Sequence, residues 1–194
     1  MLTSHRFSST LGTVTLYLED EVLIGLDLAG TAGCGGRLMA QLARHGVDTA
    51  AFRPEATPAA QAVEAWLTRY AAGSREQFAL PRKLYGTPFQ IAVWEALEAL
   101  GYDEVISYAE LARRVGSNGF RAVGTAVGHN PIPIIIPCHR IVRQDGVIGR
   151  FGAGNGTETK DERETHAERE PWIPGQCPSV RREPGDGAPP GTFQ

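Results

Sequence analysis

The segment Asn130-Pro-Ile-Pro-Ile-Ile-Ile-Pro-Cys-His-Arg-Ile-Val142 is the most distinctive part of this sequence. Its isoleucine run predicts a buried strand or strand-like segment, and the two prolines at its start exclude a central position in a sheet. The run ends at Cys138, directly followed by His139. Because a thiolate is a nucleophile and an imidazole can take the thiol proton, this pair is a candidate site of covalent chemistry.

Two considerations weigh against a simple Cys–His pair. A lone cysteine is more often a small core residue than a nucleophile. Adjacent side chains of an extended segment also point to opposite faces, so contact between Cys138 and His139 requires a turn or a bridging water. Metal binding is less favoured, because no second ligand pair stands at a suitable spacing.

Upstream of this segment, the sequence predicts three helices. Thr87-Pro-Phe-Gln90 has the residues of a capping box with proline at the first helical position, and predicts a helix to about Leu100. Ser107-Tyr-Ala-Glu110 opens a second helix through Val115, and a third begins at Phe120. Two short helices around a glycine-containing turn suggest a helix-turn-helix, with an ordinary pair of antiparallel helices as the alternative.

The third predicted helix carries little bulk, because Ala122, Gly124, Ala126 and Gly128 lie along it. Such a helix can approach another helix closely or enter a narrow groove. Arg121 stands at its start, where a long cationic side chain could reach across a duplex. The alternative for Arg121 is an ordinary surface ion pair.

The N-terminal part predicts a small α/β unit. Val14–Leu18 and Val22–Leu28 are apolar runs separated by three acidic residues, which indicates a β-hairpin. A helix is expected to start near Gly35, and a second one from Pro58 to near Gly73.

Composition narrows the class of protein further. No apolar run in the 194 residues approaches the roughly 18–20 that a membrane-spanning helix needs, and the first residues lack a signal-peptide pattern. Three cysteines at irregular spacing argue against a disulfide framework and for a reducing, cytoplasmic location. Although the net charge is −3, residues 81–152 carry eight basic and six acidic residues, which permits contact with phosphates.

At this point the sequence resembles a known family. The residues that match are Gly86-Thr-Pro-Phe-Gln, Ser107-Tyr-Ala-Glu-Leu-Ala, Arg121-Ala-Val-Gly, Asn130-Pro and Pro137-Cys-His-Arg-Ile-Val, which resemble the C-terminal domain of the O6-alkylguanine-DNA alkyltransferases. The resemblance implies an α/β fold with a small ribonuclease H-like domain over 1–80. It further implies a mostly α, winged helix-turn-helix-like catalytic domain over 86–156, followed by a tail over 157–194.

The resemblance implies direct and irreversible repair of double-stranded DNA that contains O6-alkylguanine, with O4-alkylthymine as a second candidate substrate. Cys138 would accept the alkyl group once per molecule, His139 would act as base through a water, and Asn130 would brace the active-site turn. Arg121 would fill the stack that the extruded guanine leaves, and Tyr108 would help to rotate the nucleotide. Further implied positions are Ala122 and Ala126 at the DNA, and Ile141, Gly149 and Phe151 around the guanine. No cofactor, metal or membrane is implied, and a monomer is expected, nucleoid-associated in a prokaryote.

After Gly156 the sequence departs from the family pattern. The leucine-rich helix that normally follows is replaced by a charged stretch, in which Lys160 is a candidate match for the family lysine. Glu168, in preference to Glu164, is the candidate carboxylate that would orient His139, with a solvated surface glutamate as the alternative. Residues 171–194 are rich in proline and glycine and predict disorder, as expected for a degenerate or frameshifted end.

Two other functions remain open from the sequence. One is a protein that binds alkylguanine without removing the alkyl group, because the C-terminal helix is degenerate. The other is a Cys/His hydrolase of acyl groups, which would need an oxyanion hole and would turn over repeatedly.

Overall fold

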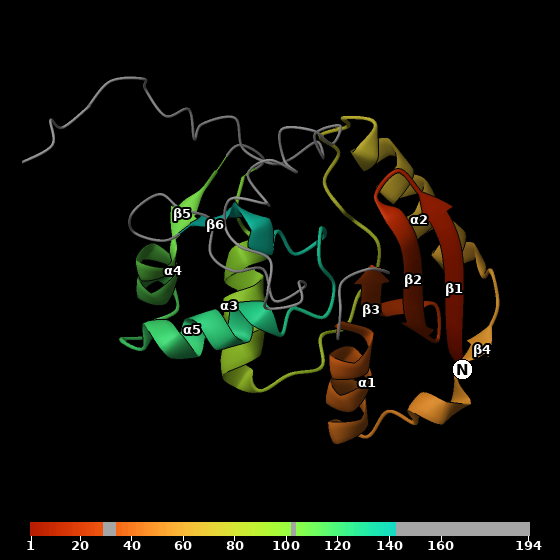
Figure 1. Cartoon of the computed structure of the whole chain (residues 1–194), viewed down its shortest axis with the longest axis horizontal. Coiled ribbons are helices and arrows are strands. Elements are labelled where there is room, and N and C mark those ends of the chain that lie inside the picture. The colour runs from red at the N-terminus through yellow and green to blue at the C-terminus, as the bar shows by residue number, and fades with distance from the viewer. Residues whose placement is uncertain (29–33, 102–103, 143–194) are drawn as a thin grey trace, which may run out of the picture.

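The computed structural model describes residues 1–28, 34–101 and 104–142. Figure 1 shows an N-terminal sheet with its helices beside a helical C-terminal part. The elements, in chain order, are β1 Leu2–Ser9, β2 Gly12–Glu19, β3 Val22–Leu28, α1 Cys34–Arg44, the 3₁₀ turn Thr49–Ala51, β4 Arg53–Pro54, α2 Pro58–Ala71, α3 Pro88–Glu98, β5 Ile106–Ser107, α4 Tyr108–Arg114, α5 Phe120–Gly128, the 3₁₀ turn Cys138–Arg140 and β6 Ile141–Val142.

The N-terminal sheet has the strand order β3-β2-β1-β4. The predicted hairpin is confirmed as β2 and β3, which pair antiparallel. Asp20 and Glu21 connect them with φ of 49° and 64°. Two successive residues of positive φ match the right-handed twist of the flanking strands, so this turn closes the hairpin without splaying it. Strand β1 was not predicted, because it has many polar residues and no clear alternation of apolar and polar positions.

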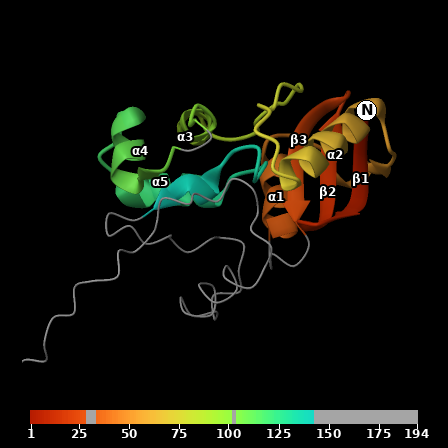
Figure 2. The ribbon, with the colours of Figure 1, turned by 90° about the horizontal axis from the view of Figure 1, so that it is seen from above.

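Two helices cover opposite faces of this sheet. Side chains alternate along a strand, so Val14, Leu16 and Leu18 point to one face, where they share a core cluster with residues of α2. On the other face Ile24 of β3 joins a second cluster with residues of α1. Figure 2 shows α2 lying across the strands. The structure thus confirms an α/β class for the chain.

The helices begin where the sequence predicts. Thr57 and Thr87 cap α2 and α3, and Thr87 and Gln90 exchange both hydrogen bonds of a capping box. Helix α2 is followed by Gly73 in the left-handed region, with φ of 97°. Ser107 caps α4 by accepting from the amide of Glu110.

The isoleucine run is not a strand, contrary to the prediction. Ile132, Ile135 and Ile136 are buried, as expected, but the segment folds as a tight turn in which Ile134 has a φ of 76°. The prolines explain the difference, because Pro131 and Pro133 lack the amide hydrogens that a strand ladder needs. The run therefore buries its side chains by turning rather than by pairing.

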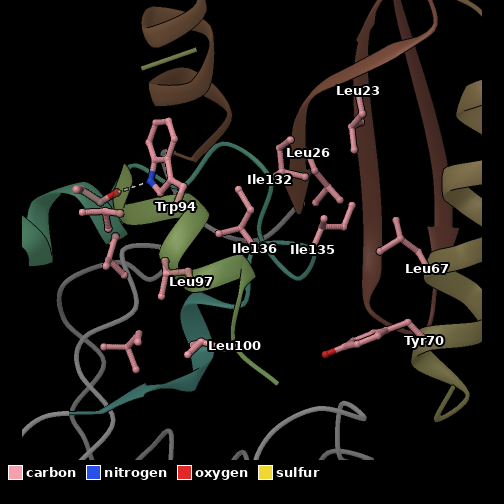
Figure 3. Close-up of a cluster of buried hydrophobic side chains, with 14 of the residues drawn as sticks. Leu23, Leu26, Leu67, Tyr70, Trp94, Leu97, Leu100, Ile132, Ile135 and Ile136 are labelled. Atoms are coloured by element: carbon pink, nitrogen blue, oxygen red, sulfur yellow. Dashed lines mark hydrogen bonds between the residues drawn. The ribbon is translucent and has the colours of Figure 1, made fainter. Parts of the chain in front are cut away.

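One continuous core joins the sheet to the helical part. Ile132 and Ile135 belong to the same cluster as Leu26 of β3, and Figure 3 shows these side chains directed toward one another. The outer edge of β3 is also paired through its backbone. Its Leu26 amide donates to the carbonyl of Pro131 at 2.9 Å, so the turn before Cys138 is fixed to the N-terminal sheet.

Within the described residues no helix is both long enough and apolar enough to cross a membrane.

A buried hydrogen bond from Trp94 yields a stability prediction. Its indole nitrogen donates to the carbonyl of Ala126 at 2.8 Å, and the side chain is fully buried. Trp94→Phe removes this buried donor and leaves a void beside the smaller ring, while the Ala126 carbonyl keeps the amide of His129 as a donor at 3.1 Å. We expect a loss of about 1–3 kcal/mol in the free energy of unfolding, measured by urea titration.

Trp66→Phe is the matched control. Trp66 is also buried, but it donates at 3.2 Å to the carbonyl of Glu76, an exposed residue that water can reach. This variant should lose about 0.5–1.5 kcal/mol. Equal losses in the two variants would contradict the importance of the buried bond.

Candidate functional site

Asn130 closes the turn that precedes Cys138. Its side-chain nitrogen donates to the carbonyl of Ile136 at 2.8 Å, and its side-chain oxygen accepts from the amide of Ile132 at 3.0 Å. The amide of Ile136 in turn donates to the carbonyl of Ile132 at 2.9 Å. One side chain therefore satisfies both a donor and an acceptor of a backbone that has no sheet partner.

Pro137 redirects the chain immediately before Cys138. It has φ of −81° and ψ of 64°, and the Cys138 amide donates to the carbonyl of Ile136 at 2.8 Å. These values define an inverse γ-turn, for which the fixed φ of proline is suited. The turn gives the cysteine a direction different from that of the isoleucine side chains.

Cys138 and His139 then lie in a 3₁₀ turn, Cys138–Arg140. With about three residues per turn, neighbouring side chains are not on opposite faces as in a strand. Cys138 and His139 are therefore not forced apart, as they would be in an extended segment. Cys138 is a thiol, and both side chains are half-buried, which leaves the sulfur partly shielded and still within reach of a substrate.

Arg140 anchors the same turn to α3. The side chain is only 6% exposed, and its Nη1 donates to the carbonyls of Gly101 at 2.8 Å and Leu100 at 3.5 Å, just beyond the end of α3. A cation at a helix C-terminus is favoured by the helix dipole and by the carbonyls that have no partner within the helix. No separate role was predicted for Arg140. Its charge inside an apolar segment is the feature of the sequence that could have indicated an anchoring role.

Two short strands bring Tyr108 to the cysteine. Ile106 and Ser107 of β5 pair in parallel with Ile141 and Val142 of β6, which directly follow the 3₁₀ turn. Tyr108 begins α4 right after Ser107. Burial raises the pKa of the Tyr108 phenol, and Cys138, in its ionised form, raises that pKa further.

Helices α4 and α5 form the predicted pair of short helices around a turn. Gly116 in that turn has a φ of 64°, which favours glycine. Arg121 and Ala122 of α5 are exposed, as expected for a surface that meets a large partner. Ala126 does not fit that expectation, because it is 1% exposed and its carbonyl accepts from Trp94. Its small side chain permits close packing on α3 instead.

Arg121 differs from the arginines of α4. Arg113 pairs with Glu110 at 2.7 Å and Arg114 pairs with Glu104 at 2.6 Å, which lowers the pKa of both glutamates. Among the described residues, Arg121 makes no such ion pair. Within the described part of the chain no carboxylate holds its guanidinium, and the residue is exposed.

The structure thus gathers part of the predicted site. It places Asn130, Cys138, His139 and Ile141 in one continuous segment, and Tyr108 electrostatically close to Cys138. Ile141 is 2% exposed and pairs with Ile106 in the β5–β6 pair. Gly149, Phe151 and Glu168 lie outside the described residues. Within the described part of the chain, no cluster of three or more histidine, cysteine or acidic side chains is suited to a metal.

Comparison with known proteins gives a consistent result. Residues 88–168 match the family described as 6-O-methylguanine DNA methyltransferase, DNA binding domain. The constitutive methylated-DNA–protein-cysteine methyltransferase of Bacillus subtilis is 44% identical over 105 residues, which are 54% of this chain and 63% of that protein. The Haemophilus influenzae methylated-DNA–protein-cysteine methyltransferase is 48% identical over 99 residues, 50% of this chain and 55% of that protein. The matched region is thus little more than half the length of these relatives.

Solved structures match over a longer stretch. The crystal structure of Mycobacterium tuberculosis OGT in complex with DNA has a TM-score of 0.67 and 30% identity, covering 91% of this chain and 96% of that chain. The O6-methylguanine-DNA methyltransferase of Pyrococcus kodakaraensis has a TM-score of 0.56 and 27% identity, covering 88% and 99%. The likeness therefore includes the N-terminal part, where the sequence is less distinctive.

The Asn130 hydrogen bonds yield a prediction for the turn. Asn130→Ala removes a donor and an acceptor from partly buried backbone groups, and should lower the free energy of unfolding by about 1–3 kcal/mol in urea titration. Asn118→Ala, at an exposed position between α4 and α5, is the matched control and should change it by less than about 0.5 kcal/mol. Equal effects of the two substitutions would contradict the bracing role.

The interaction of Tyr108 with Cys138 yields a prediction about titration. Converting the sulfur to a thioether, or substituting Cys138→Ser, removes the negative charge that raises the pKa of Tyr108. The pKa should therefore fall, yet stay above its ordinary value because burial, the larger cause, remains. Absorbance titration of the phenol, with Tyr108→Phe as the subtracted reference, measures the change. An unchanged or raised pKa would rule out the interaction.

Proposed function

The chain belongs to the family of O6-methylguanine-DNA methyltransferases, and on that premise we propose that it repairs DNA by transferring an alkyl group from O6 of guanine to the sulfur of Cys138. The observation that carries the proposal is the half-buried Cys138 thiol on a turn that Asn130 and Arg140 hold in place. A nucleophile fixed in this way can meet a bound carbon atom without reorganisation of the backbone.

The proposed reaction is an in-line displacement. The Cys138 thiol gives its proton through a water to His139, and the thiolate attacks the alkyl carbon. A carbon–sulfur bond forms, the bond from carbon to O6 breaks, and its electron pair stays on the guanine. The guanine then takes one proton, so atoms and charge balance without a cofactor. The thioether is not reversed by ordinary cellular thiols, so each molecule acts once. O4-alkylthymine offers the same kind of carbon and is a second candidate substrate.

The proposed partner is double-stranded DNA. Helices α4 and α5 would serve as the helix-turn-helix, with exposed Arg121 entering the stack and Ala122 allowing the backbone to approach closely. Tyr108 would contact the phosphate of the rotated nucleotide. As a neutral phenol it can donate a hydrogen bond to a phosphate. Extrusion of the base is required, since O6 inside the duplex is out of reach of the sulfur.

Several finer assignments belong to the same proposal. We propose that residues 1–80 form a small ribonuclease H-like domain, and the strand order β3-β2-β1-β4 supports this assignment. Residues 86–156 would form a winged helix-turn-helix-like catalytic domain, with 157–194 as a tail. The backbone at Ile141, with Gly149 and Phe151, would line the guanine pocket, and Glu168 would orient His139. The protein would act as a cytoplasmic monomer.

Mass spectrometry of the intact protein tests the transfer. After incubation with a duplex that contains one O6-methylguanine, a methyl group should replace the thiol hydrogen of Cys138, a net mass gain of one CH2, and the gain should stop at one per molecule. Cys138→Ala should gain nothing. Tight binding to the modified duplex without a mass change would overturn the proposal and favour a damage-binding protein, whereas continued turnover of an acyl ester would favour a hydrolase.

A further inference from the structure

Phe120 is an aromatic side chain that the fold does not use. It is 59% exposed, and among the described residues only Met1, at the start of the chain, is a comparably exposed large hydrophobic. It is not among the side chains that pack against either core cluster. A single exposed hydrophobic residue is common on protein surfaces, so its meaning depends on its position.

The position of Phe120 is the first turn of α5, directly before Arg121. Successive residues of a helix are about 100° apart. Because Val123 and Val127 are buried, Arg121 points away from the core and Phe120 lies on one flank of the exposed face. Gly124 lies on the same flank, and a Cβ there would be 3.9 Å from Cε1 of Tyr108. The phenylalanine therefore stands on the side of α5 that faces Tyr108.

We propose that Phe120 is an apolar wedge that works beside Arg121, inserting at the base step next to the extruded nucleotide. This inference rests on the proposed function. Removing a guanine from the duplex leaves the neighbouring bases partly unstacked, and an aromatic ring can cover an exposed base face that a guanidinium covers less well. Apolar side chains between base steps are a known way of stabilising a distorted minor groove.

The contributions of Phe120 and Arg121 to DNA affinity should depend differently on salt concentration. Arg121 attracts phosphates through its charge, so its contribution weakens as salt rises. Phe120 carries no charge and contributes by stacking, which is far less sensitive to salt. Replacing Phe120 should therefore weaken binding to the modified duplex by a similar factor at every salt concentration. The slope of affinity against salt should stay as in the parent chain.

The main experiment compares two substrates. One is a duplex with a single O6-methylguanine, and the other is a free O6-alkylated guanine base, which needs Cys138 but no base step. Phe120→Ala should slow transfer from the duplex by about tenfold, which corresponds to the loss of stacking on one aromatic ring. Transfer from the free base should be unchanged. Phe120→Leu, which keeps an apolar side chain able to wedge, should retain most of the parent rate. The midpoint of thermal unfolding should stay the same, because Phe120 is exposed.

The opposite results overturn the inference. An unchanged duplex rate in Phe120→Ala excludes a wedge, and so does an equal loss with both substrates or an equal loss in the alanine and leucine variants. A concentration-dependent dimer that Phe120→Ala abolishes, with transfer intact, assigns the ring to a contact between copies of the chain. Failure of the proposed function is distinct, because the parent chain would then alkylate Cys138 with neither substrate.

Discussion

The two hydrogen bonds of the Asn130 side chain are the constraint on which the site depends. Three prolines, Pro131, Pro133 and Pro137, deprive this segment of amide donors, so it cannot pair as a strand. Its remaining polar groups still need partners, because the segment is largely buried. Asn130 supplies them from one side chain. With the turn closed, the isoleucines enter the core and the inverse γ-turn at Pro137 leads to Cys138, which lies half-buried against that core.

The N-terminal sheet gives this turn a fixed support. The amide of Leu26 at the edge of β3 donates to the carbonyl of Pro131, and the isoleucines pack on the same strand, as Figure 3 shows. On the other side, Arg140 links the turn to the C-terminal end of α3. The reactive segment is thus held from two elements distant in sequence. Loosening either support would move the sulfur, and small displacements of a nucleophile are costly for a reaction that depends on alignment.

Much of the fold could be predicted because its signals are local. The capping box at Thr87 and Gln90 and the hairpin around Asp20 depend on residues a few positions apart, and both form as expected. The errors have different causes. Whether Ala126 faces solvent or α3 depends on Trp94, 32 residues earlier, whereas the isoleucine run fails to pair as a strand because of the prolines within it. The Pro-Cys-His-Arg motif was enough to predict the site residues. The anchoring role of Arg140 could not be predicted, because it depends on carbonyls at the end of α3 that lie far away in the sequence.

The small residues of α5 serve two different purposes. Ala126 is small because α3 packs closely against it, and a larger side chain there would separate the two helices from each other. Ala122 lies one turn earlier on the same side of the helix, but it is exposed, and nothing within the described residues requires a small side chain there. Alanine is the best helix former, so helix stability alone also accounts for it. What the small side chain adds is room beside Arg121, which under the proposed function lets the narrow groove of a duplex approach this face, with the charge of Arg121 suited to its phosphates.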